Sequence, residues 1–160
     1  MKGFRPLSMT AALAVASGGA LAPVLASATP ASARPSCAGT SLVRSALGLS
    51  VRVPTTANGT RDVSCSLGVG NVGVAVSRLQ IGLDHCLNAF AVKPAVAVDG
   101  VYGSKTRHAV SQVQHFYHIP QDGIYGPMTA HHMLWPIPNT NYQSCSQIAS
   151  SPPVILGPSR

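Results

Sequence analysis

Residues 99–106 read Asp-Gly-Val-Tyr-Gly-Ser-Lys-Thr, and residues 122–129 repeat the phrase as Asp-Gly-Ile-Tyr-Gly-Pro-Met-Thr. The two copies begin 23 residues apart, a spacing expected of a small supersecondary unit repeated in tandem. Asp-Gly is a strong turn signal, because the carboxylate accepts local backbone hydrogen bonds and glycine adopts positive φ without strain. Each copy therefore predicts a structural turn that leads into a helix, with turn positions at Asp99, Gly100, Gly103, Asp122, Gly123 and Gly126.

Helical periodicity around the two copies predicts three short helices. The first extends from about residue 72 to 87, the second from 104 to about 117, and the third from 127 to about 135. Ser104 is the expected N-cap of the second helix, and Pro127 fits the first position of the third. The predicted fold is all-α: a small three-helix bundle with two Asp-Gly turn-helix repeats, stabilised by disulfides.

The N-terminal segment, residues 1–33, has the features of a secretory signal peptide. A short positive region is followed by an Ala-rich apolar core and an Ala-Ser-Ala cleavage site at residues 31–33. Cleavage there leaves nine basic residues against four acidic ones, a formal charge of +5. Such a charge attracts the protein to anionic surfaces. The basic residues are scattered, so no nucleic-acid partner is expected, and no membrane association is expected after cleavage.

All four cysteines lie in the predicted mature chain, at positions 37, 65, 86 and 145. An even number of cysteines in a small exported protein predicts two disulfides. Three pairings of Cys37, Cys65, Cys86 and Cys145 are possible, and the sequence leaves them open.

Composition divides the mature chain into three parts. Residues 34–64 are rich in small and polar residues and are expected to form a semi-ordered extension, in which Ser41–Leu49 could form a short helix. Residues 65–136 form the predicted domain. Residues 137–160 are expected to be an irregular tail that carries Cys145, because several prolines prevent regular structure.

The chain has few of the groups that hydrolases use. It contains no glutamate, and its only acidic side chains are Asp62, Asp84, Asp99 and Asp122. Glycosidases need two carboxylates that flank a cleft, and zinc hydrolases need spaced histidines with an acidic base. No G-x-S-x-G motif is present either. We therefore expect no catalytic residue, no metal site and no cofactor.

Residues 76–80 (Val-Ser-Arg-Leu-Gln), followed by the two Asp-Gly phrases with Thr106 and Thr129, resemble the peptidoglycan-binding domain of bacterial wall hydrolases. That family has V-x-x-L-Q, then D-G-x-F/Y-G-x-x-T, then D-G-x-x-G-P-x-T. The resemblance covers residues 65–136 and implies a three-helix fold that binds peptidoglycan non-covalently and usually targets an attached enzyme to the wall. The signal peptide, charge and disulfides resemble those of secreted actinobacterial members. The remaining segments are expected to be too short for a catalytic domain.

Four residues in this region are candidates for ligand contact. An aromatic face stacks on sugar rings, which favours Tyr102 and Tyr125, and cations pair with stem-peptide carboxylates, which favours Lys105 and Arg107. The alternative is that the tyrosines fill the core and the cations are ordinary solvated charges.

The function expected from the sequence is a secreted, non-catalytic, monomeric module that binds peptidoglycan outside the cell or in the wall. Two alternatives remain open: a small wall hydrolase with an unrecognised active site, and a secreted protein-interaction module on the same fold. In either case Gln80 and Gln114 are expected to hold loops in place, and Trp135 to anchor the third helix.

Overall fold

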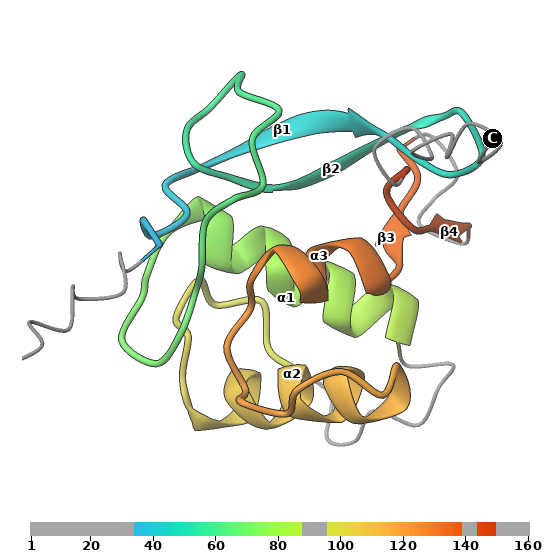
Figure 1. The fold of residues 1–160 in the computed structure, drawn as a ribbon. Coiled ribbons are helices and arrows are strands. Elements are labelled where there is room, and N and C mark those ends of the chain that lie inside the picture. The colour runs from blue at the N-terminus through green and yellow to red at the C-terminus, as the bar shows by residue number, and fades with distance from the viewer. Residues whose placement is uncertain (1–33, 88–95, 139–143, 150–160) are drawn as a thin grey trace, which may run out of the picture. The chain divides into compact units, whose positions relative to one another are not determined.

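The computed structural model describes residues 34–87, 96–138 and 144–149. Three helices and two small antiparallel sheets make up this part of the chain (Figure 1). In chain order they are β1 (Gly39–Arg44), β2 (Ser50–Thr55), α1 (Val74–Leu87), α2 (Ser104–Phe116), α3 (Pro127–His132), β3 (Trp135–Pro136) and β4 (Cys145–Ser146). The predicted signal peptide lies outside the described residues.

The three helices lie close to their predicted positions. On α1 the side chains of Val76, Leu79 and Leu83 are buried, as expected of an apolar stripe at helical spacing. Pro127 is the first residue of α3, as predicted. The N-cap of α2 is Gly103, and no side chain caps this helix, so the prediction of Ser104 as N-cap was wrong by one residue.

The prediction of an all-α bundle was wrong, because residues 39–55 form a β-hairpin. β1 pairs with β2 in antiparallel register, and the turn between them includes Gly48 at a φ of 77°. Val43, Val51 and Val53 point into the core, and β-branched residues favour strands because they pack well on a pleated surface. Ser41–Leu49, considered above as a helix, contributes instead to β1 and the hairpin turn.

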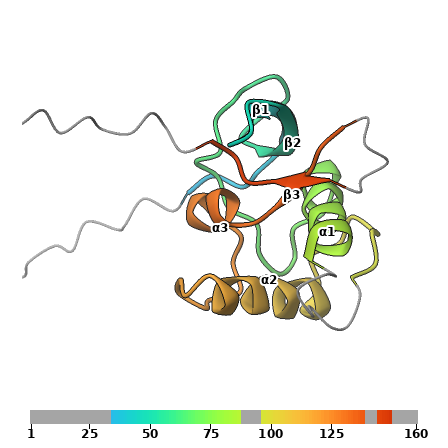
Figure 2. The ribbon, with the colours of Figure 1, turned by 90° about the vertical axis from the view of Figure 1, so that its right-hand side faces the viewer.

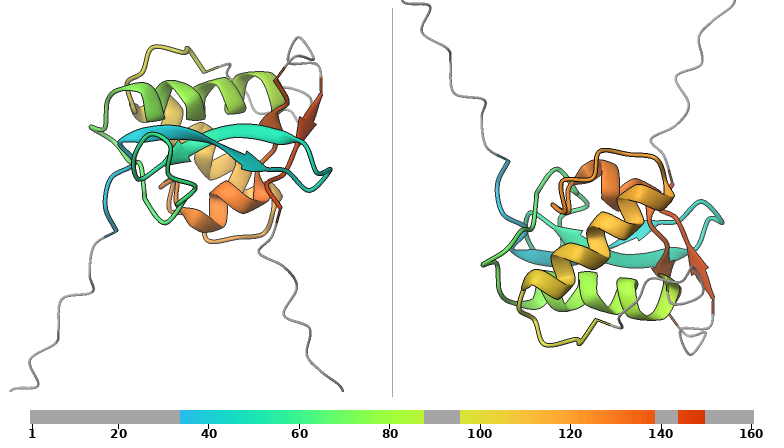
Figure 3. Two further views of the ribbon diagram at one scale, coloured as in Figure 1. Left: turned by 90° about the horizontal axis from the view of Figure 1, so that it is seen from above. Right: turned by 90° about the horizontal axis from the view of Figure 1, so that it is seen from below.

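The hairpin packs on the helices, within the stretch assigned from sequence to an extension. The hairpin covers α1 and α3 on one side, and α2 crosses beneath them on the other (Figures 1 and 3). Arg78 of α1 is a buried link, because its Nε donates to the Arg52 carbonyl (2.6 Å) and its Nη2 to the Pro136 carbonyl (3.4 Å). One side chain therefore joins α1 to both sheets. Where a domain begins and ends stays a prediction.

The second sheet pairs β3 with β4 and contains Trp135. In the view of Figure 2, β3 lies below the hairpin, with α3 on one side of it and α1 on the other. The indole is fully buried, donates to the Ala130 carbonyl (2.9 Å), and meets the ring of Tyr125 edge-on with centroids 6.0 Å apart. Trp135 thus anchors the end of α3, as expected. Its ring also lies against Gly82 of α1, where a Cβ atom would come within 3.1 Å of it.

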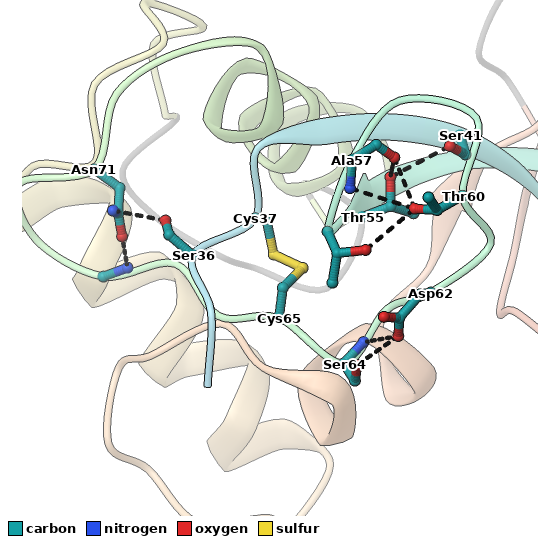
Figure 4. Close-up of a disulfide and its surroundings, with 12 residues drawn as sticks. Ser36, Cys37, Ser41, Thr55, Ala57, Thr60, Asp62, Ser64, Cys65 and Asn71 are labelled. Atoms are coloured by element: carbon teal, nitrogen blue, oxygen red, sulfur yellow. Dashed lines mark hydrogen bonds between the residues drawn. A yellow bond between two sulfur atoms is a disulfide. The ribbon is translucent and has the colours of Figure 1, made fainter. Parts of the chain in front are cut away.

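The structure contains two disulfides and defines their pairing. Cys37 bonds Cys65, which ties the start of the hairpin to the segment before α1 (Figure 4). Cys86 bonds Cys145, which ties the end of α1 to β4. The prediction of two disulfides is confirmed.

Candidate functional site

The two Asp-Gly phrases form two loops, which we call loop 1 (residues 99–103) and loop 2 (residues 122–126). Their first glycines, Gly100 and Gly123, have φ values of 73° and 65°, in the left-handed region that side chains disfavour. In each loop the aspartate Oδ1 accepts from the backbone N–H two residues later, at 2.9 Å. The predicted structural turns are therefore present in both copies.

A buried glutamine on the preceding helix holds loop 1. The Nε2 of Gln80 donates to Asp99 Oδ1 (2.7 Å), the Val101 carbonyl (3.0 Å) and Thr106 Oγ1 (3.2 Å). In return, the Gly100 N–H donates to Gln80 Oε1 at 2.8 Å. Hydrogen bonds from the Val101 N–H, and then from Gln80, hold the pKa of Asp99 below its ordinary value.

Loop 2 is held by Gln114 in the same way. Its Nε2 donates to Asp122 Oδ1 (2.7 Å), the Ile124 carbonyl (3.0 Å) and Thr129 Oγ1 (3.2 Å), and its Oε1 accepts from the Gly123 N–H (2.9 Å). We call each such arrangement a glutamine clip. The expectation that these glutamines hold loops in place is confirmed, and the sequence repeat is a repeat of the clip.

The two candidate tyrosines lie in the core. Tyr102 is 1% exposed and Tyr125 is fully buried. The Tyr102 hydroxyl donates to the Gly123 carbonyl (3.0 Å), which links loop 1 to loop 2, whereas the Tyr125 hydroxyl has no hydrogen-bond partner among the described residues. Burial raises the pKa of both phenols. Neither ring presents a face on which a sugar could stack.

This difference between the tyrosines predicts that removing their hydroxyls has different effects on the free energy of unfolding. Tyr102→Phe is expected to lower the free energy of unfolding by about 1 kcal/mol, because it leaves the buried Gly123 carbonyl without its donor. Tyr125→Phe is expected to be neutral or stabilising, because it removes a buried hydroxyl that has no partner. Chemical denaturation of both variants, followed by the fluorescence of Trp135, measures the difference. Equal losses in the two variants would contradict the assigned hydrogen bond.

The backbone of both tyrosines pairs with one segment that precedes α1. Leu67 exchanges two hydrogen bonds with Tyr125, each of 2.9 Å, and the Asn71 carbonyl accepts from the Tyr102 N–H at 2.9 Å. This segment carries Cys65, so the disulfide to Cys37 holds it in place beside both loops. Asn71 also donates to Ser36 Oγ (3.0 Å), on the other side of that disulfide (Figure 4).

A groove lies between α2 and loop 2, with a cavity of about 330 Å³. Polar side chains and one glycine line it: Ser104, Arg107, His108, Ser111, Gln121, Asp122 and Gly123. We call it the α2 groove. The stem of Arg107 lies on loop 2, since a Cβ atom on Gly123 would come within 2.6 Å of the Arg107 Cγ. Within the described part of the chain, the exposed Arg107 guanidinium makes no ion pair or hydrogen bond, so it is free for a ligand.

The other candidate cation, Lys105, lines a second hollow, of about 210 Å³, beside loop 1. The positive charge of Lys105 adds slightly to the lowering of the Asp99 pKa. The structure therefore separates the four residues predicted to contact ligand: two lie in the core, one lines the α2 groove, and one lines a different hollow.

Three groove residues were not predicted from the sequence: His108, Ser111 and Gln121. A signal for two of them was present, because residues 104, 107, 108 and 111 recur at the i, i+3, i+4, i+7 spacing of one helix face. That face carries only polar side chains. Gln121 could not be assigned in this way, since it lies in a loop, where it contacts His115 Nδ1 at 3.0 Å.

In the ranges 34–87, 96–138 and 144–149, no three His, Cys, Asp or Glu side chains are grouped so that they could hold a metal ion. None of the helices in those ranges is long and apolar enough to cross a membrane.

Known proteins resemble the part of the chain that contains the clips and the groove. A probable N-acetylmuramoyl-L-alanine amidase of Bacillus licheniformis is 42% identical over 64 residues, which is 39% of this chain and 18% of the amidase. The chain thus matches less than a fifth of that relative's length.

Two solved structures also match, at lower similarity. The N-terminal domain of SleB is 29% identical, with 41% of this chain and 84% of that one covered and a TM-score of 0.35. The endolysin of Burkholderia phage AP3 is 38% identical, with 40% and 22% covered and a TM-score of 0.34. Residues 72–133, which include both loops, both glutamine clips and the α2 groove, match the family described as putative peptidoglycan binding domain.

Proposed function

We propose that this chain is a secreted, non-catalytic module that binds bacterial peptidoglycan through the α2 groove. The observation that carries the proposal is the family match over residues 72–133, because it spans the two clips and every residue that lines the groove. The names of the matched relatives, an amidase and an endolysin, are those of proteins that act on the bacterial wall.

The groove offers chemistry that suits this polymer. Peptidoglycan presents carboxylates and amides on its stem peptides and hydroxyls on its sugars. Arg107 supplies a guanidinium that can form two parallel hydrogen bonds with a carboxylate, and His108 and Gln121 supply polar groups beside it. The positive net charge of the chain favours approach to an anionic wall.

The acidic side chains support a role without catalysis. Asp99 and Asp122 each use Oδ1 as the acceptor of a glutamine clip. Asp62 accepts from the hydroxyl and N–H of Ser64, bonds that hold its pKa below the ordinary value. Three of the four aspartates thus serve local structure, and the chain has no glutamate. The matches cover only 18% of the amidase and 22% of the endolysin.

Secretion and a location in or near the cell wall belong to the same proposal. The features of residues 1–33 favour export, and two disulfides are typical of proteins that fold in an oxidising compartment. The actinobacterial origin expected from the sequence stays a prediction, since the matched amidase is from Bacillus.

Co-sedimentation with purified, insoluble peptidoglycan tests the binding. We expect the oxidised mature protein to be retained at about 0.5 M NaCl, where the screening length is roughly 4 Å and surface charge alone contributes little. Insoluble cellulose, a polymer without stem peptides, is the control and should retain none. Loss of all binding at that salt concentration would contradict a specific site. Release of soluble muropeptides from the same pellet would contradict the non-catalytic assignment.

A further inference from the structure

The two clips define which residues of the repeats are equivalent. Seven residues before Gln80 is Gly73, immediately before α1, and seven residues before Gln114 is Arg107 on α2, so these two positions are equivalent. The backbone contacts agree: the carbonyl of Gly73 lies 3.6 Å from the Cβ position of Gly100, and that of Arg107 lies 3.2 Å from the Cβ position of Gly123. Each loop therefore lies against the equivalent backbone position of its repeat, although Gly73, at a φ of 116°, precedes α1 whereas Arg107 lies within α2.

The exposed side chains of the two repeats differ at the equivalent positions. Around loop 1 and the start of α1, apolar side chains are exposed: Val72, Val74, Val98 and Val101. Around loop 2 the exposed apolar side chains are Ile124 and Met128. In the second repeat the residues that correspond to Gly73 and Val74 are Arg107 and His108, and the groove beside them is polar. The guanidinium of Arg107 thus has no counterpart at the equivalent position of the first repeat, where the cation Lys105 lines the separate hollow beside loop 1.

The lining of the α2 groove also decides between the two parts of peptidoglycan. Sites that bind glycans usually present an aromatic ring on which a sugar stacks. No Phe, Tyr or Trp lines the groove, and the tyrosines of both loops face the core. What the groove has is a free guanidinium, two hydroxyls, an imidazole and an amide.

One carboxylate lies in the groove as well. Asp122 Oδ1 is already the acceptor of Gln114 Nε2 and of the Ile124 N–H. A ligand that suits this mixture carries both an anionic group for Arg107 and N–H donors that tolerate a neighbouring carboxylate. A peptide with a free carboxylate has both, whereas a neutral sugar chain has no anionic group.

We infer that the ligand of the α2 groove is the stem peptide of peptidoglycan, with a peptide carboxylate bound by Arg107, and that the glycan is not recognised there. This inference rests on the proposed function and specifies which part of the polymer the site binds.

Calorimetry with soluble fragments tests the inference on the oxidised mature protein. The probes are a stem tetrapeptide, the same peptide with its carboxyl groups amidated, and chitotetraose as the glycan. The variants are Arg107→Ala, Arg107→Lys, and Arg61→Ala as a matched control, which removes the same charge from an exposed position outside the groove. Thermal unfolding of each variant verifies that it is folded.

We expect the tetrapeptide to bind, and amidation or Arg107→Ala to weaken binding about tenfold or more, as for a lost charge-assisted hydrogen bond. Arg107→Lys should fall between, because lysine keeps the charge but not the planar fork, and Arg61→Ala should change binding less than twofold. The amidated peptide makes the test independent of the variants' stability.

Three results would overturn the inference. The first is equal binding of the free and the amidated peptide. The second is displacement of the protein from insoluble peptidoglycan by chitotetraose but not by the tetrapeptide, which would leave the proposed function standing. The third is failure to bind insoluble peptidoglycan at all, which would overturn the proposed function together with this inference.

Discussion

Replacing Gln114 with methionine is expected to lower the free energy of unfolding by about 3 kcal/mol, a large part of the 5–15 kcal/mol typical of a domain. Methionine keeps the length and most of the volume of the side chain but removes both polar atoms. The buried Gly123 N–H then loses its acceptor, and the Ile124 carbonyl and Thr129 hydroxyl lose a shared donor. A buried donor without a partner costs about 1–3 kcal/mol.

Denaturant unfolding at neutral pH measures this effect through the single tryptophan, which is fully buried. Gln121→Met is the matched control, because this glutamine is exposed and contacts only His115 among the described residues; we expect it to change stability by less than about 0.5 kcal/mol. Gln80→Met should cost about as much as Gln114→Met, since the two clips are alike. A Gln114→Met variant as stable as the control would contradict the structural role assigned to the clip.

The helical part of the fold could be predicted from sequence because its signals are local. The doubled Asp-Gly phrase marks two turns, and the apolar spacing on α1 and α2 marks two buried faces. Pro127 marks the start of α3 correctly, because proline lacks only an N–H that has no partner at that position. The clips themselves join residues 19 and 8 positions apart. The sequence therefore predicted that each glutamine holds a loop, but the hydrogen bonds of the clip required the structure.

The hairpin was missed because its stabilising contacts are distant in sequence. Residues 41–49 have few strong helix breakers, which favoured a short helix there, and Pro54 lacks the N–H that a ladder hydrogen bond needs. Hydrogen-bonded pairs alternate along an antiparallel ladder, and the Ser45 N–H donates to the Leu49 carbonyl. The Thr40–Pro54 pair lies five positions along the register from the hydrogen-bonded Ser45–Leu49 pair, so it is a non-hydrogen-bonded pair. The missing N–H of Pro54 therefore breaks no ladder bond. Packing of the hairpin on α1 then outweighs local propensity.

The candidate site was only partly predictable for a similar reason. Val101 and Tyr102 are adjacent and both apolar enough to be buried, and the sequence does not say which of them faces the core. The backbone pairing of Tyr102 with Asn71 decides it, and it turns Val101 outward. Arg107, by contrast, lies on a helix face that carries only polar residues, so its exposure could be predicted from the helical spacing alone.

Removing the Cys86–Cys145 disulfide should have the largest effect on stability. Replacing both cysteines with alanine is expected to cost about 4 kcal/mol, because the bond closes a 59-residue loop and restricts the unfolded chain. Alanine is preferred to serine here, since Cys86 is buried and a hydroxyl would lack a partner. Thermal and denaturant unfolding of the double variant, beside the native protein with and without reductant, measures the effect.

The Cys37–Cys65 pair provides the comparison, because it closes a 28-residue loop and is expected to contribute roughly half a kcal/mol less. The two bonds also protect different parts. The 59-residue loop contains both Asp-Gly loops and the whole α2 groove, whereas the 28-residue loop contains the hairpin. Loss of Cys86–Cys145 should therefore weaken ligand binding as temperature rises, well before loss of Cys37–Cys65 does. If the two double variants unfold at the same denaturant concentration as the native protein, the disulfides add nothing to stability, and packing of the hairpin and α1 must be sufficient for the fold.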